Sequence, residues 1–281
     1  MKKEGQNRKK ESGRRLYTVF IIIFSVGLIV CLVWMVRDYR NQKKAEEQFE
    51  ALAALSEEPE TAVPEEGEPG KSTQQEESEL GESTQQIEVP EKNLDWDALA
   101  EENEDIYAWI YIPGTQVDYP ILQHPTEDDY YLNHNLDGSS GYPGCIYTQR
   151  LNGKEFGDAN TVIYGHNMGN GTMFGSLHEY EDNTFFEENP YVYIYTPNET
   201  LVYEIFAACT FSDAHLLYSY DCTLETDFNA YVEDLKGVRD MNSHVRPEVE
   251  ICYGDHLLTL STCIKNQPTQ RWIVAAVLLN K

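Results

Sequence analysis

The sequence predicts a mainly β (α+β) protein, built as a closed or nearly closed β-barrel with a few helices. Many short apolar runs have the length and composition of strands, and turn residues separate them. In the second half of the chain, only residues 226–235 have convincing helical periodicity. Closing the sheet is one way in which many short strands protect their edges, so a barrel is the expected architecture.

The chain divides into four segments of different composition. Residues 1–15 are rich in Lys and Arg, and residues 16–36 carry no charge and are long enough to span a lipid bilayer. A cleaved signal peptide is the alternative for this segment. Residues 37–90 are dominated by Glu, Gln, Ser, Pro and Gly and are predicted to form a disordered acidic tether, with a helical start at 45–55 left open. Residues 91–281 suffice for one domain with its own core.

The charges on either side of the apolar segment predict its orientation. Seven Lys and Arg residues precede it and four follow it closely. The positive-inside rule therefore places the N-terminus in the cytoplasm and the domain outside the cell. Residues 91–281 contain 31 acidic and 9 basic residues, a net charge of −22. This balance excludes nucleic acid and anionic lipid head groups as partners of the domain, because both require basic patches.

The individual elements of the domain follow from local patterns. Thr226 is a candidate N-cap for the best helix, which is expected to stop at Gly237. The other helical segments are predicted at residues 95–103, 130–132, 173–180 and 185–186. The strands are predicted at residues 106–112, 117–122, 145–147, 161–164, 191–195, 200–212, 257–263 and 271–279.

The last two strands carry the first candidates for chemistry. If they pair as a hairpin around a loop at residues 264–270, Cys263 and Arg271 become neighbours at one edge of the sheet. A guanidinium favours the thiolate form of a neighbouring cysteine, and the thiolate is the nucleophile. His166 follows another predicted strand and Gly165, where it is held by the scaffold and open to a groove. It is therefore the candidate acid/base.

The other cysteines are interpreted as packing residues, since a lone cysteine is usually buried. These are Cys145, Cys209, Cys222 and Cys252. The cysteines beyond the apolar segment are odd in number, which argues against a disulfide framework. Zinc is not predicted either, because no Cys-x-x-Cys spacing occurs.

Three stretches together resemble the sortases, the cysteine transpeptidases that attach surface proteins to Gram-positive cell walls. They are residues 164–168 (Tyr-Gly-His-Asn-Met), residues 259–263 (Thr-Leu-Ser-Thr-Cys) and Arg271. The resemblance implies the sortase barrel, and the helical segments at 95–103 and 226–235 are similar to features of class B. It implies catalytic roles for His166, Cys263 and Arg271, with neither metal nor cofactor.

The same resemblance implies the substrates. The donor would be a secreted protein with a C-terminal sorting signal of the Asn-Pro-x-Thr-Asn or x-Pro-x-Thr-Gly type, and the acceptor a peptidoglycan amine. Leu132 and Ser261 match the positions that contact the sorting signal in class B relatives. Two alternatives stay open at this point: a hydrolytic cysteine peptidase of the cell wall, and a non-catalytic binding domain tethered to the membrane.

Overall fold

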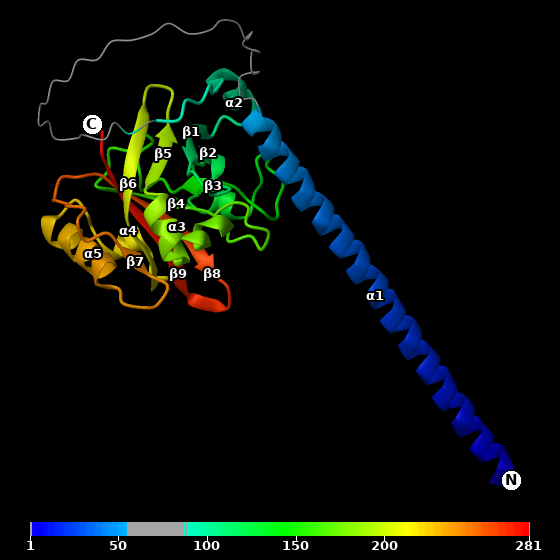
Figure 1. Ribbon diagram of the computed structural model, residues 1–281. Helices are drawn as coiled ribbons and strands as arrows, with labels where there is room; N and C mark the ends of the chain where they lie inside the picture. Colours follow the sequence, from blue (N-terminus) through cyan, green and yellow to red (C-terminus); the bar gives the residue numbers. More distant parts are fainter. Residues whose placement is uncertain (1, 55–86, 88, 281) are drawn as a thin grey trace, which may run out of the picture.

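The computed structural model describes residues 2–54, 87 and 89–280. Its centre is a closed barrel of eight strands in the order β5-β1-β2-β3-β4-β8-β9-β6, completed by pairing of β5 with β6 (Figure 1). The predicted fold class is thus confirmed. The strands are β1 (Ile106–Tyr111), β2 (Asp118–Leu122), β3 (Ile146–Thr148), β4 (Asn160–Tyr164), β5 (Tyr191–Tyr195), β6 (Thr200–Ser212), β8 (Leu257–Ile264) and β9 (Gln267–Leu278), with β7 (His244–Val245) paired to β6 outside the ring.

The wall formed by β4, β8 and β9 is buried on both faces. On β9, Val274 and Ala276 join the large core cluster that contains Trp109. Ile273 and Ala275, which alternate with them along the strand, join a second cluster with residues of helix α5 (Glu225–Gly237). Because successive strand residues point to opposite faces, burial of both faces explains why the sequence is continuously apolar here.

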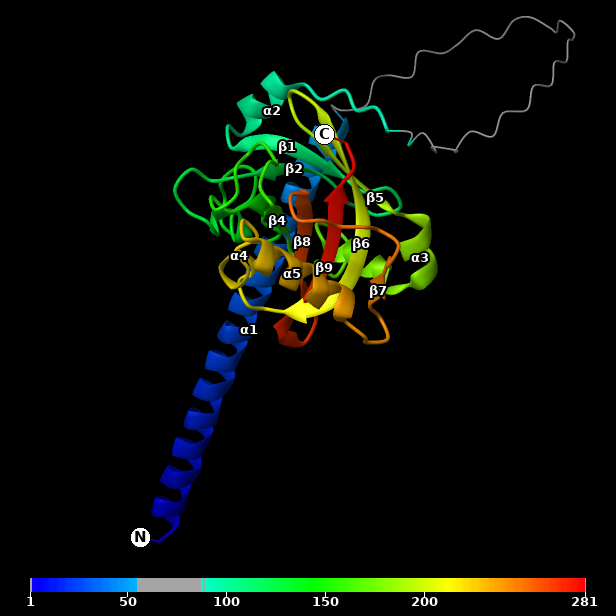
Figure 2. The same ribbon diagram turned by 90° about the vertical axis from the view of Figure 1, so that its left-hand side faces the viewer.

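Helices cover parts of the barrel (Figure 2). Helix α2 (Trp96–Glu102) has Asp95 as its N-cap, and the Asp95 carboxylate accepts a hydrogen bond from the Ala98 amide at 3.0 Å. Helix α5 begins one residue before Thr226, so the prediction of Thr226 as its N-cap is wrong. The short elements are η1 (Tyr130–Leu132), η2 (Gly175–Glu181), α3 (Asn183–Glu188) and α4 (Leu216–Ser219). Neither α4 nor β7 was predicted, because both are too short to show periodicity.

The hairpin between β8 and β9 is tighter than the sequence suggested. Only Lys265 and Asn266 separate the strands, and Asn266 has a left-handed φ of 62°. The expected loop at residues 264–270 is therefore wrong. Pro268 lies in β9 beyond Gln270, where the pairing with β6 ends. A proline is tolerated there because its missing amide hydrogen faces no second strand.

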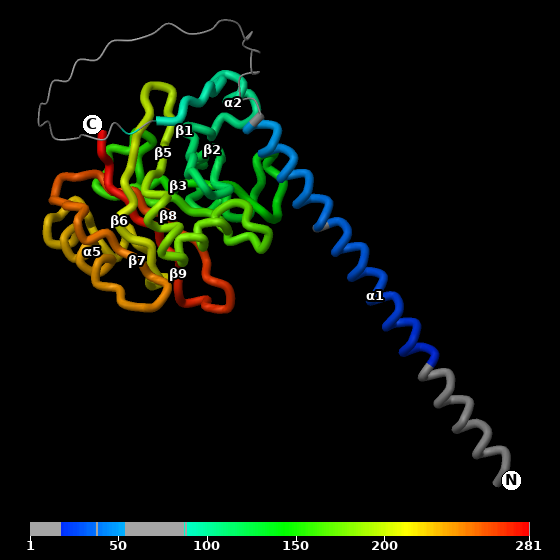
Figure 3. The backbone as a smooth tube through the Cα atoms, in the orientation of Figure 1, coloured from blue at the N-terminus to red at the C-terminus, as the bar shows by residue number. Residues whose placement is uncertain are grey.

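Helix α1 (Lys2–Ala54) extends far from the barrel and is long and apolar enough to cross a membrane over residues 18–53 (Figure 3). Its last turns pack on the barrel: Phe49 and Leu52 are buried in the large core, and the Phe49 ring meets Tyr119 edge-on at 5.5 Å. The helix therefore continues to Ala54, the alternative that the sequence left open at 45–55, and its packing on the barrel was not predicted. Residues 55–86 and 88 lie outside the described part of the chain.

Candidate active site

Cys263 lies near the end of β8, on the outer face of the barrel wall. It pairs directly with Arg271 of β9, as the sequence predicted. Strand alternation places Ser261 and Cys263 on β8, and Arg271 and Ile273 on β9, on this same face. Cys263 is exposed, which leaves its sulfur open to a reactant.

His166 reaches the same place from β4. This strand runs parallel to β8 with Tyr164 opposite Ser261, so the two strands end side by side. The Thr262 hydroxyl donates to the Gly165 carbonyl at 2.8 Å, which joins the strand ends one residue before His166. A Cβ at Gly165 would lie 2.5 Å from Cδ1 of Ile146 and 2.8 Å from the buried Phe174 ring, so a larger residue would have to displace both side chains.

A cavity of about 310 Å³ brings the sequence candidates together. Its lining includes all five predicted site residues: Leu132, His166, Ser261, Cys263 and Arg271. It also includes Asp129, Tyr147, Gln149, Tyr164, Asp213 and His215, which the sequence did not single out. These side chains come from separate strands and loops, and no shared motif marked them.

The hydrogen bonding of His166 defines its tautomer. Its Nε2 lies 2.7 Å from the carbonyl oxygen of Leu132, and a carbonyl only accepts, so Nε2 carries the hydrogen. Nδ1 is then the nitrogen left to exchange a proton. Burial lowers the pKa of His166, and the bond to Leu132 works in the opposite direction. Leu132 was predicted from its side chain, and this role of its backbone was missed.

Arg271 supplies a positive charge to the cavity wall. Its Nη1 donates to the carbonyl oxygens of Pro268 at 3.1 Å and Gln270 at 2.9 Å. These bonds anchor one corner of the guanidinium to its own strand. Among the described residues no partner is found for Nε and Nη2, which can therefore meet a substrate oxygen.

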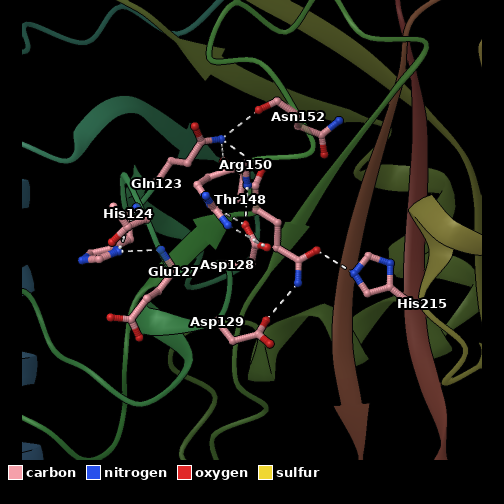
Figure 4. A network of polar contacts seen from close by, with 11 residues as sticks. Gln123, His124, Glu127, Asp128, Asp129, Thr148, Arg150, Asn152 and His215 are labelled. Carbon is pink, nitrogen blue, oxygen red and sulfur yellow. Dashed lines mark hydrogen bonds and ion pairs between the residues drawn. The ribbon is translucent and has the colours of Figure 1, made fainter.

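A polar network contributes Asp129, Gln149 and His215 to the lining of the cavity (Figure 4). His215 Nε2 donates to Gln149 Oε1 at 2.7 Å, and Gln149 Nε2 donates to Asp129 Oδ1 at 2.9 Å. The neighbouring Asp128 binds the Arg150 guanidinium at 2.9 Å. The network ties the loop before α4 to the loop before η1, so the cavity wall is held by side chains from distant parts of the sequence.

The other cysteines outside α1 differ from Cys263. Cys145, Cys209 and Cys222 are buried, which confirms their interpretation as packing residues. Desolvation raises the pKa of Cys209 to about 12 and that of Cys222 to about 11, so both stay protonated. Cys252 is exposed, and its assignment to packing is wrong.

Comparison with known proteins identifies consistent relatives. The family model of the Sortase domain matches residues 110–279. Sortase B of Listeria monocytogenes is 33% identical over 185 residues, covering 65% of this chain and 73% of the relative. Sortase B of Clostridium perfringens is similar in structure, with a TM-score of 0.59 and 28% identity, covering 66% of this chain and 99% of that one. A substrate complex of Staphylococcus aureus sortase B gives a TM-score of 0.58 at 26% identity, with 66% and 84% covered.

Proposed function

This chain belongs to the sortase family of cysteine transpeptidases, with class B relatives, and we propose that it anchors secreted proteins to the cell wall. Its donor would carry a C-terminal sorting signal of the Asn-Pro-x-Thr-Asn or x-Pro-x-Thr-Gly type, and its acceptor would be a peptidoglycan amine. The observation that carries the proposal is the cavity shared by His166, Cys263 and Arg271. The solved complex of S. aureus sortase B with a substrate supports a substrate-processing role for this chain.

In the proposed mechanism, Cys263 and His166 act in succession. The Cys263 sulfur attacks the carbonyl carbon of the sorting-signal threonine as its proton passes to Nδ1 of His166. His166 then gives that proton to the leaving amine, the C–N bond breaks and a thioester remains. An acceptor amine attacks the thioester, His166 takes the proton of that amine, and the C–S bond breaks as His166 returns the proton to the sulfur.

Two features of the cavity support this sequence of steps. Because burial lowers the pKa of His166, its imidazole is mainly neutral near pH 7 and can accept the thiol proton. The free donors of Arg271 are suited to the oxyanion that forms at the threonine carbonyl. Leu132 and Ser261 line the same cavity and are proposed to contact the sorting signal.

We place the protein in the cell membrane with residues 16–36 as its single span. The apolar helix α1 supports a lipid-bilayer anchor, and the unequal flanking charges support a cytoplasmic N-terminus at residues 1–15. The catalytic domain, residues 91–281, would then face the cell wall, joined to the span by residues 37–90. This placement would bring the enzyme to substrates that emerge across the same membrane.

Mass spectrometry can test the proposed function on the full-length chain in detergent. With a set of sorting peptides, we expect a thioacyl adduct on Cys263 in the wild type and none in Cys263→Ala. Adding an amine acceptor should convert the adduct into an amide product. A wild-type enzyme that forms no adduct with any of these peptides would contradict the proposal. Release of free acid alone, even with excess amine, would instead indicate a hydrolytic peptidase.

A further inference from the structure

The carbonyl oxygen of Cys263 is held by the side chain of Asn167, which lies outside the β8–β9 hairpin. Asn167 Nδ2 donates to it at 2.8 Å, and His178 Nε2 lies 3.2 Å from it. The register between β8 and β9 shifts between Cys263 and Ile264, so the regular ladder is interrupted just after the nucleophile. Bulges near active sites redirect side chains. At this strand end, the hydrogen bond from Asn167 fixes the backbone where the ladder is interrupted.

The neighbouring groups determine how the Asn167 amide is oriented. His178 Nδ1 lies 2.6 Å from a carboxylate oxygen of Glu181, which only accepts, so Nδ1 carries the hydrogen. In this tautomer Nε2 accepts from Asn167 Nδ2 at 2.9 Å and does not donate to the Cys263 carbonyl. The two amide hydrogens of Asn167 therefore go to His178 and to the Cys263 carbonyl. In the flipped orientation, the amide oxygen of Asn167 would instead face two acceptors, His178 Nε2 and the Cys263 carbonyl oxygen, so this orientation is unfavourable.

The histidine itself is braced on two sides. Its ring stacks on Trp272 with the ring centroids 5.6 Å apart, and the buried Trp272 indole donates to the Leu177 carbonyl at 2.8 Å. Glu181 accepts a second hydrogen bond, from Asn242 at 3.0 Å. Through Asn167 and His178, the Cys263 backbone is thereby connected to the buried Trp272 ring and to the Glu181 carboxylate, which is itself held by two hydrogen bonds.

These side chains do not line the cavity that holds His166 and Arg271. They meet Cys263 only at its backbone, so any effect on the reaction passes through that residue. We propose that Asn167 is a positioning residue, oriented by His178 and Glu181, that fixes the peptide group of Cys263 and so aims its sulfur at the substrate carbonyl. This inference rests on the proposed function and adds residues to its site.

Substitutions at Asn167 test the proposal in the full-length enzyme by steady-state cleavage of a sorting peptide. Asn167→Ala should lower kcat by about tenfold to a hundredfold, the range expected for a misplaced nucleophile, with little change in KM. Asn167→Asp should lose more, because its carboxylate faces the Cys263 carbonyl without a hydrogen to donate. Asn170→Ala removes an asparagine from the same loop whose side chain binds Glu46 and Thr172 instead, and it should behave like the wild type.

Thermal melting of each variant separates positioning from folding. If Asn167→Asp retains the wild-type kcat, or if Asn170→Ala loses as much activity as Asn167→Ala, the proposal is overturned. If the wild type itself forms no thioacyl adduct, the proposed function fails instead, so the two failures are distinguishable.

A second pair of variants does not depend on the stability of Asn167→Asp. His178→Phe keeps the ring stacked on Trp272 but removes the acceptor for the Asn167 amide, and kcat should fall several-fold. In the Asn167→Ala background the same change should cost nothing further, because both act through one amide. If the losses in kcat of the two single variants add fully in the double variant, the two residues act independently, and the proposed orientation of Asn167 by His178 is overturned.

Discussion

The two histidines near the end of β8, His166 and His178, differ in their hydrogen bonding. On the cavity face, His166 makes one side-chain hydrogen bond within the described part of the chain, to the Leu132 carbonyl, and keeps Nδ1 for chemistry. On the opposite face, His178 uses both ring nitrogens, one toward Glu181 and one toward Asn167. Two histidines near one cysteine therefore differ in role because one has a free nitrogen and the other has none. Substitutions on each face should therefore differ in which step of the reaction they impair.

The largest effect is expected from His166→Gln. The new amide can still donate to the Leu132 carbonyl, but it has no nitrogen that exchanges protons near neutral pH. We expect kcat for peptide cleavage to fall by about 10²–10⁴-fold, the usual contribution of a general acid/base. Steady-state kinetics with the sorting peptide measures this. A loss below tenfold would place proton exchange elsewhere.

Arg271→Lys tests whether charge alone suffices on the cavity face. Lysine keeps the positive charge but cannot bind its own strand and the substrate together as a planar guanidinium does. We expect kcat to fall by about 10²-fold, at the lower end of values for losing an oxyanion donor. Unchanged kcat in the lysine variant would reduce the role of Arg271 to that of a point charge.

Tyr142→Ala should move the pH profile. The Tyr142 ring lies 4.8 Å from the His166 ring and contributes to its burial, which lowers the pKa of His166. The acidic limb of kcat/KM should therefore lie below the ordinary histidine pKa of about 6.5 in the wild type. Removing Tyr142 lets water reach the imidazole, raises its pKa and shifts this limb to higher pH. A limb that stays in place would exclude Tyr142 as a cause of the shift.

The smallest effect is expected on stability, at the contact that joins the two strand ends. Thr262→Val removes the donor to the buried Gly165 carbonyl, which should lower the free energy of unfolding by about 1–3 kcal/mol. Thr262→Ser keeps the hydroxyl and serves as the control. Urea denaturation of both variants provides the comparison. Equal destabilisation by serine and valine would attribute the loss to methyl packing.

Much of the hairpin β8–β9, which carries Cys263 and Arg271, could be predicted from local sequence. The continuous apolar runs around Cys263 and Arg271 predicted two buried strands, and their pairing in a hairpin was correct. The hairpin turn was misjudged because Pro268 usually marks a loop, and only the end of β6 shows that β9 has an open side there. The packed end of α1 was also missed, since Phe49 lies in a segment whose composition is otherwise that of a disordered chain.

Local patterns were enough to predict the eight barrel strands, the apolar helix and the identity of the candidate nucleophile, acid/base and arginine, because periodicity and motifs are local properties of the chain. The free nitrogen of His166 and the group that holds the Cys263 carbonyl became visible only in the folded chain. His178 is 85 residues from Cys263 in the chain, and barrel closure and strand register bring them together. Contacts of this kind depend on how distant segments pack, and a single sequence carries no local sign of them.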